Sequence, residues 1–249
     1  MASSRSWRSS PAPLRTLGAL LAALLGVGGV AADEAEALLR AVHEDRTVES
    51  RALLEQGAGA DEANRYGVRP LPLASANGNA ELVKALLEAG ADPNSADEGG
   101  ATALMAAARS GRPAVVEALL QAGAKAATRD RSGQSALMWA AAEGHARCVE
   151  LLLAAGANRE ARLDSGFTAW HFAAREGHRA VIAVLLADGA DVNDPIETKR
   201  GGGRAPKNGT SALLLAIENG HFELGNDLLE AGADPNDLRS THGPLHVLT

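Results

Sequence analysis

Apolar residues recur along most of this chain in two short runs, separated by glycine and accompanied by a polar stretch. Leu104 to Ala108 has the form Leu-x-x-Ala-Ala, and residues 115–120 place paired valines and leucines on one face at helical spacing. Gly111 separates these two runs, and the segment 92–100 before them is polar and rich in turn-forming residues. The pattern predicts a helix, a tight turn, a second helix and a hairpin.

This unit recurs every 33 residues. A Gly-Ala pair, preceded by two leucines, closes each second helix and begins at Gly57, Gly90, Gly123, Gly156 and Gly189. A second glycine series in the hairpins keeps the same interval, at Gly67, Gly100, Gly133 and Gly166. One unit has too little apolar area to fold alone, so neighbouring units are expected to stack and share their leucine and alanine faces.

A hydroxyl side chain stands where four of the first helices should begin, at Thr102, Ser135, Thr168 and Ser211. Such a hydroxyl can accept a hydrogen bond from the unpaired N–H groups of the first turn. Pro70 takes the next position in its own unit, where the missing N–H of proline is harmless. These residues fix the predicted starts of the first helices.

The organisation resembles the ankyrin-repeat family over residues 34–249. The family signature Gly-x-Thr-Pro-Leu-His is matched by Gly166 to His171, its Gly-His turn by Gly144-His145, and its Leu-Leu-x-x-Gly-Ala-Asp-x-Asn ending by Leu86 to Asn94. The resemblance implies an all-α repeat solenoid of stacked helix-turn-helix-hairpin ankyrin repeats of 33 residues. It also implies that His145, His178 and His221 steady the inter-helix turns, and that partners bind the hairpin tips and the concave face lined by first helices.

The repeats divide the chain, although two intervals depart from the period. The interval from Gly189 to Gly232 is 43 residues, which places extra residues in a basic, glycine-rich hairpin tip. Pro244-Leu245-His246 opens a further repeat that stops at Thr249, so we expect a truncated repeat in a fragment of a longer protein. The predicted units are a degenerate N-terminal capping repeat (33–63), full repeats (64–96, 97–129, 130–162, 163–194 and 207–237), an insertion (195–206) and the truncated repeat (238–249).

The first 32 residues have the layout of a cleaved secretory signal. Three arginines precede an apolar stretch from Leu17 to Val30, and small residues lead into Asp33. The apolar stretch is shorter than the roughly 20 residues that a membrane-spanning helix needs. We expect cleavage after Ala32, an exported (periplasmic or secreted) protein, and no stable membrane insertion afterwards. Retention of the segment as an anchor, or a cytoplasmic protein with an accidental apolar start, stays open.

Charge and composition exclude several classes of function. The net charge is −7, and removing residues 1–32 leaves −10, so the chain gains nothing from phosphate counterion release and we expect no nucleic-acid partner. The single cysteine, Cys148, excludes an internal disulfide framework and a cysteine-rich zinc site. Only seven aromatic residues are present, fewer than the core of a large enzyme usually holds.

Candidate catalytic chemistry is weak throughout. The histidines recur because the repeat requires them, and no His-x-x-x-His or His-Glu-x-x-His zinc spacing appears. Gly201-Gly202-Gly203 lacks the spacing and the preceding strand of a phosphate-binding loop, and Cys148 has no assured catalytic partner. We therefore expect no catalytic residue, no metal, no cofactor and no enzyme activity.

Two aromatic residues could mark a partner-binding face. Trp139 and Phe172 are 33 residues apart, so they occupy the same register on adjacent first helices. A tryptophan beside arginine is common at interaction hot spots. The residues expected to join them, at nearby tips or first-helix positions, are Arg109, Arg131, Arg175, Phe167 and Tyr66. The alternative, that Trp139 and Phe172 only thicken the core, stays open, whereas Trp170 stands at the leucine position of the signature and is expected in the core.

The insertion is the second candidate surface. It places four positive charges on one loop of an acidic protein: Lys199, Arg200, Arg204 and Lys207. Such a tip could dock on an acidic or anionic surface, or could be a solvated loop without a binding role. Asn208-Gly209-Thr210 also fits the N-glycosylation sequon.

These features together predict a non-catalytic scaffold or regulator that binds a protein partner outside the cytoplasm. The alternative is the recognition domain of a longer exported enzyme or electron-transfer protein.

Overall fold

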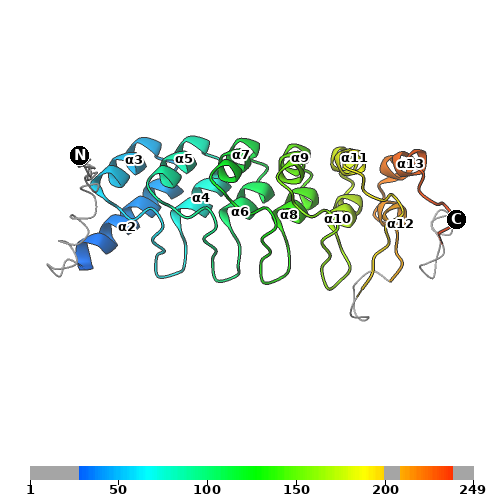
Figure 1. Ribbon diagram of the computed structural model, residues 1–249, viewed down its shortest axis with the longest axis horizontal. Helices are drawn as coiled ribbons and strands as arrows, with labels where there is room; N and C mark the ends of the chain where they lie inside the picture. The colour runs from blue at the N-terminus through cyan, green and yellow to red at the C-terminus, as the bar shows by residue number, and fades with distance from the viewer. Residues whose placement is uncertain (1–27, 199–207, 238–249) are drawn as a thin grey trace, which may run out of the picture.

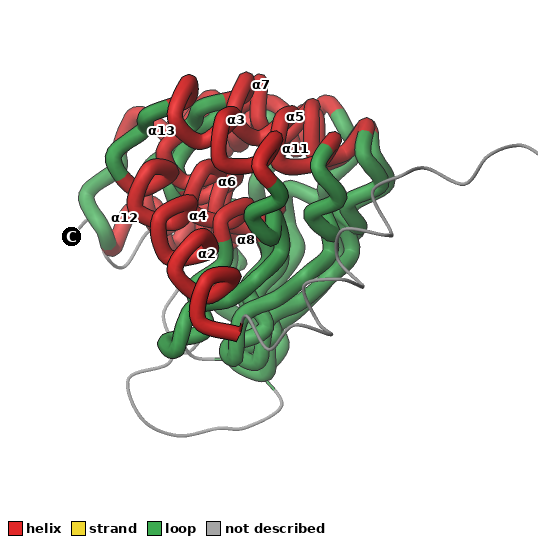
Figure 2. Tube along the Cα trace, turned by 90° about the vertical axis from the view of Figure 1, so that its left-hand side faces the viewer, coloured by secondary structure: helices red, strands yellow, loops and turns green. Residues whose placement is uncertain are grey.

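The computed structural model describes residues 28–198 and 208–237, and these form an elongated stack of helix pairs (Figure 1). In each pair a first helix is followed by a turn and by a second helix that runs beside it. The first helices form one row and the second helices another, and the hairpins project from the first-helix side. Viewed along the stack, the helices lie at one end of the cross-section and the hairpin loops at the other (Figure 2). The predicted all-α repeat solenoid is confirmed.

The two rows contain six helices each in the described part of the chain. The first helices are α2 (Gly28–His43), α4 (Pro70–Asn77), α6 (Ala103–Arg109), α8 (Ala136–Ala142), α10 (Ala169–Glu176) and α12 (Ala212–Glu218). The second helices are α3 (Thr47–Gln56), α5 (Ala80–Glu88), α7 (Pro113–Gln121), α9 (Ala146–Ala154), α11 (Arg179–Ala187) and α13 (Phe222–Glu230). Within the described ranges, β-structure is limited to isolated bridges in two hairpins.

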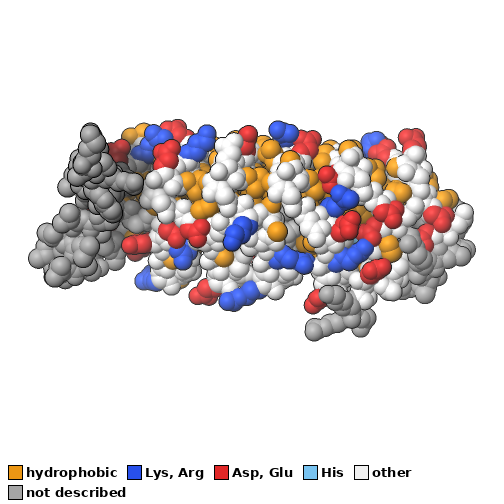
Figure 3. Space-filling model, viewed as in Figure 1, with side chains coloured by type: hydrophobic (Ala, Val, Ile, Leu, Met, Phe, Trp, Pro, Cys, Tyr) orange, Lys and Arg blue, Asp and Glu red, His pale blue; other side chains and the backbone are white. Residues whose placement is uncertain are grey.

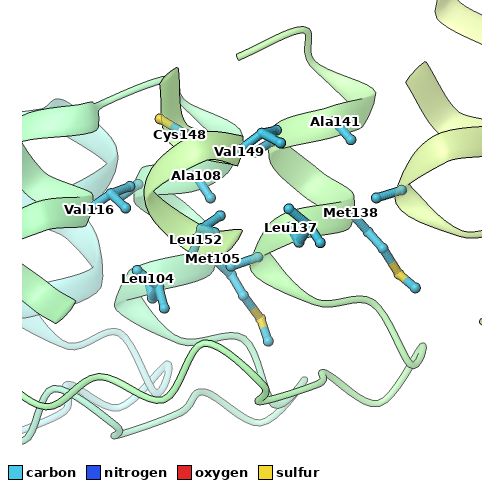
Figure 4. Close-up of a cluster of buried hydrophobic side chains, with 14 of the residues drawn as sticks. Leu104, Met105, Ala108, Val116, Leu137, Met138, Ala141, Cys148, Val149 and Leu152 are labelled. Carbon is cyan, nitrogen blue, oxygen red and sulfur yellow. The ribbon is translucent and has the colours of Figure 1, made fainter. Parts of the chain in front are cut away.

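Alanine makes the close approach of the first helices possible. The first and fifth positions after the N-cap are alanine in each first helix from α6 to α12, and all are buried: Ala103, Ala136, Ala169, Ala212, Ala107, Ala140, Ala173 and Ala216. Larger side chains fill the space between the rows, and Figure 4 shows Leu104, Leu137 and Leu152 of α6, α8 and α9 in one such cluster. Burying a leucine typically contributes roughly 2–3 kcal/mol. Repetition of the cluster therefore makes the core continuous along the stack.

The predicted caps are present on three helices. The hydroxyls of Thr102, Ser135 and Ser211 each accept a hydrogen bond from the main-chain N–H three residues further along. At α10, the ring of His171 turns back instead, and its Nδ1 accepts from the N–H of Thr168 at 3.3 Å. The starts of the first helices were therefore predictable from hydroxyl positions.

The turn histidines link one helix pair to the next. The Nε2 atom of His145 lies 3.0 Å from the main-chain oxygen of Arg109, which belongs to the preceding first helix. The rings of His178 and His221 make the same contact with Ala142 and Arg175, each at 2.9 Å. These histidines do more than steady their own turns, because each ties its turn to the C-terminal end of the preceding first helix.

The extra residues of the long interval lie within one hairpin. The main-chain N–H of Ile196 donates to the oxygen of Thr210 at 2.9 Å, just as that of Leu163 donates to Phe167 in the preceding hairpin. Ile196 is fully buried. Residues 195 and 196 therefore belong to the hairpin base, and the insertion begins after them. Its four predicted basic side chains, Lys199, Arg200, Arg204 and Lys207, lie outside the described residues.

The N-terminal segment predicted to be a secretory signal is only partly described. Residues 1–27 lie outside the described ranges, and α2 begins at Gly28, so the expected cut after Ala32 falls inside this helix. None of the described helices is long and apolar enough to cross a membrane. The truncated repeat expected at 238–249 also lies outside the described residues.

Candidate partner-binding surface

Each first helix from α4 to α12 has an apolar side chain at the fourth position after the N-cap. We call this set the first-helix row: Leu73, Ala106, Trp139, Phe172 and Leu215. Leu73, Ala106 and Trp139 are half-buried, whereas Phe172 and Leu215 are buried. The accessible part of the row therefore lies on α4, α6 and α8.

Trp139 is the largest accessible side chain of the row. The guanidinium carbon of Arg109, on the neighbouring helix α6, lies 5.4 Å from the centre of its ring. A cation over an indole face at this distance is favourable, by about 0.5–1 kcal/mol where solvent has access. The contact leaves Arg109 exposed.

Phe172 is covered by its own repeat. The ring of Phe167, from the hairpin, lies 5.0 Å from the ring of Phe172, and the guanidinium of Arg175 lies over both rings at 5.3 and 5.2 Å. Phe167 and Phe172 are therefore 3% and 8% exposed. The sequence left Phe172 open between core and binding face, and the structure places it in the core. The accessible candidate surface is consequently narrower than expected and centres on Trp139.

The remaining predicted aromatic lies at a hairpin tip. Tyr66 is 71% exposed, and the guanidinium of Arg65 lies 4.8 Å from its ring centre. Arg131 lies at a tip two repeats further along and is exposed, and its main-chain N–H donates to the oxygen of Gly99 at 2.8 Å. The tips thus contact one another, but no contact joins Tyr66 or Arg131 to Trp139.

A family model for ankyrin repeats in three copies matches residues 17–97, 50–130 and 104–196. A second model, for a single ankyrin repeat, matches residues 208–240. The matches stop and resume on either side of the insertion. The chain belongs to the ankyrin-repeat family. A search of curated proteins found no match to it. Ankyrin repeats generally mediate protein–protein interaction.

The ankyrin repeat containing α10 departs from its neighbours at two buried positions. Trp170 stands where leucine stands in the repeats of α6, α8 and α12, and it is only 3% exposed. Its indole Nε1–H has no hydrogen-bond partner among the described residues, and neither has the Nε–H of Arg159. Both residues line a cavity of about 310 Å³ between the repeats of α8 and α10, with Arg162 and Asp194 on its wall. The indole of Trp170 thus lies beside this cavity with a buried donor unpaired.

His171 is the second departure, at a position that holds methionine in α6 and α8. Its Nδ1 accepts from the N–H of Thr168, and its Nε2 lies 3.1 Å from the main-chain oxygen of Asp194. Burial lowers the pKa of His171 to about 4, and the nearby Arg162 guanidinium adds to this, whereas the hydrogen bond to Asp194 opposes it. The ring is therefore neutral near pH 7 and has a structural role.

The described residues contain no group of three or more side chains suited to hold a metal ion. Cys148 is 1% exposed, and burial raises the pKa of its thiol, the opposite of what a nucleophile needs. On the face shown in Figure 3, acidic and basic side chains are interspersed.

The sequence identified Trp139 and Arg109 as candidates but not as a stacked pair. Their contact joins two repeats, so it depends on side-chain rotamers that the 33-residue period does not specify. The cavity beside Trp170 was missed altogether. The sequence shows only that position 170 is exceptional, since tryptophan replaces leucine at this one repeat position among α4 to α12.

Proposed function

We propose that this ankyrin array is a non-catalytic scaffold or regulator whose protein partner contacts the first-helix row around Trp139. The observation that carries the proposal is the contrast between neighbouring positions of the first helices. The positions that pack between repeats hold alanine in each helix from α6 to α12, whereas the first-helix row differs in every one: Ala106, Trp139, Phe172 and Leu215. The row therefore has no single residue type that repeat packing requires, and at its accessible end a half-buried tryptophan with arginine beside it is typical of an interface hot spot.

Affinity capture from native extract with the full chain as bait tests this proposal. Trp139→Ala should abolish retention of a specific partner. Phe222→Ala, which removes an aromatic ring that is 57% exposed on α13, is the matched control and should retain it. Circular dichroism should be the same for all three baits. Retention of the same partner by the Trp139 variant would place the binding surface elsewhere.

We also propose that the protein acts outside the cytoplasm. The support is the order of arginines, short apolar stretch and small residues in the first 32 residues. N-terminal sequencing of the native protein decides the matter: a mature chain that begins near Asp33 supports export, and an intact N-terminus in a cytoplasmic fraction contradicts it.

A further inference from the structure

Arg109 has no carboxylate partner among the described residues, and it is the arginine of this kind that lies beside Trp139. Several other arginines contact a carboxylate: Arg159 is paired with Asp188, Arg162 with Asp194 and Arg175 with Glu176. Within the described residues, no carboxylate lies within 4.0 Å of the Arg109 guanidinium and no hydrogen bond engages it; its one contact is with the Trp139 ring. It is exposed on the accessible part of the first-helix row.

Two features of the neighbouring repeat favour the position of Arg109 over Trp139. The main-chain oxygen of Arg109 contacts the ring of His145 at 3.0 Å, which anchors the end of α6. The equivalent position on α8 is Ala142, whose small side chain leaves room for the guanidinium to extend across to Trp139. Since the Trp139 ring contacts one side of the guanidinium, part of the conformational entropy that the Arg109 side chain would lose on binding is already lost in the free protein.

The partner chemistry follows from this arrangement. A planar guanidinium with unused N–H donors matches a carboxylate in bidentate geometry, and it does so better than lysine would. Beside it, Ala106 and Leu73 provide a half-buried apolar strip on α6 and α4. The site therefore combines the unpaired guanidinium of Arg109 with the neighbouring apolar side chains of Ala106 and Leu73.

We infer that the partner presents an acidic segment, with an Asp or Glu carboxylate bound by Arg109 above Trp139 and an apolar side chain on the Ala106–Leu73 strip. This rests on the proposed function and names the chemistry of the partner at the same surface. The net charge of −7 opposes acidic partners at long range, so recognition depends on this local contact rather than on the overall field.

A library of short random peptides displayed on phage, selected against the immobilised full chain, tests the inference. Enriched peptides should share an acidic residue close to an apolar one. Arg109→Gln should weaken their binding by at least about tenfold, measured by fluorescence anisotropy, because it removes the charge and the bidentate contact. Arg109→Lys should restore only part of the affinity, since it keeps the charge but not the fork.

Arg147→Gln is the control. It removes an exposed arginine on the second helix α9, outside the first-helix row, whose Nη1 already donates to Glu150 at 2.6 Å. Peptide binding should change by less than about twofold. Equal urea midpoints for the two variants would exclude unfolding as the cause of any difference.

The outcomes separate this inference from the proposed function. Peptides that lose binding with Trp139→Ala but not with Arg109→Gln, or that lack acidic residues, would overturn the acidic-partner inference and leave the binding surface in place. Peptides indifferent to both substitutions, or an unenriched library, would overturn both.

Discussion

The imidazole ring of His178 occupies the space that a side chain on Gly144 would need. A Cβ atom on Gly144 would lie 2.6 Å from Nδ1 of that ring, whose Nε2 at the same time contacts the main-chain oxygen of Ala142 at 2.9 Å. Gly144 also has a φ of +79°, in the left-handed region. Two features thus favour glycine at position 144: its left-handed backbone conformation and the closely packed His178 ring of the following repeat.

Replacing Gly144 should therefore cost more than backbone strain alone. Gly156 has a nearly equal φ of +81° but open space around its Cβ position, so Gly156→Ala should destabilise the chain by about 1–2 kcal/mol. Gly144→Ala should cost at least about 1 kcal/mol more, because the methyl group displaces His178 from its hydrogen bond. Urea unfolding of both variants measures the difference, and equal costs would show that the histidine adapts freely.

The tryptophan in the leucine position of α10 offers a second comparison. Trp170→Leu installs the residue found in neighbouring repeats and removes the unpaired indole donor, so the lost apolar contact and the relieved donor should nearly cancel. The unfolding free energy should change by less than about 1 kcal/mol. Trp170→Ala should lose about 3–5 kcal/mol, the usual cost of truncating a buried tryptophan. Similar large losses for both variants would mean that the indole N–H is satisfied in solution.

His171 should make stability depend on pH. Its folded-state pKa of about 4 lies below the ordinary value of 6.5, so the unfolded chain takes up the proton first as the pH falls. The stability of the folded chain should be unaffected by this group above pH 6.5 and should decline between about pH 6.5 and 4, by at most about 3 kcal/mol.

His171→Met isolates this contribution, because methionine occupies the position in α6 and α8. The variant loses the contacts to Thr168 and Asp194 at every pH, but the gap between it and the natural chain should narrow as the pH falls. Urea midpoints measured from pH 7.5 to 4 provide the comparison. A gap that is constant over this range would contradict a neutral, buried imidazole.

An asparagine bridge joins some repeats and is missing from two, where Ala127 and Glu160 take the asparagine position. The side chain of Asn94 donates to the oxygen of Gly123 at 3.1 Å and accepts from the N–H of Lys125 at 2.9 Å, so Asn94→Ala should cost about 1–2 kcal/mol. Ala127 takes this position in the next repeat. Ala127→Asn should restore the bridge and raise the unfolding free energy by about 0.5–1 kcal/mol in denaturant titrations. No gain would indicate that the adjacent loop does not present its polar groups in the same way.

Much of the fold was predictable because the same sequence pattern recurs in successive repeats. Helix pairs, hydroxyl caps and the position of the insertion follow from residues that recur at fixed intervals, such as Thr102 and Gly100. Each recurrence reflects a local requirement of the backbone: a cap, a left-handed turn or a close helix contact. The structure reproduces the helix pairs and the caps in the described repeats, whereas the insertion predicted to begin at residue 195 begins after Ile196.

The surface was predictable only in part, because it depends on contacts between repeats that differ in sequence. Trp139 and Phe172 share a register, yet Phe172 is buried beneath Arg175 and Phe167 while Trp139 stays accessible. The difference arises from the direction of the two arginine side chains. Arg175 lies over Phe172 of its own helix, whereas Arg109 lies over Trp139 of the next first helix. The 33-residue sequence pattern does not specify the direction of these arginine side chains.

A main-chain hydrogen bond between Ile196 and Thr210 closes the base of the long hairpin, and this bears on which sequence changes the hairpin tolerates. Ile196 and Thr210 are bonded as in a short hairpin, and Asn193 and His221 still reach the neighbouring repeats across it. Residues enclosed by that base can be exchanged, lengthened or shortened without altering the spacing of α10 and α12. The array therefore offers a natural grafting point, where a foreign loop could be displayed while the scaffold beneath it keeps its shape.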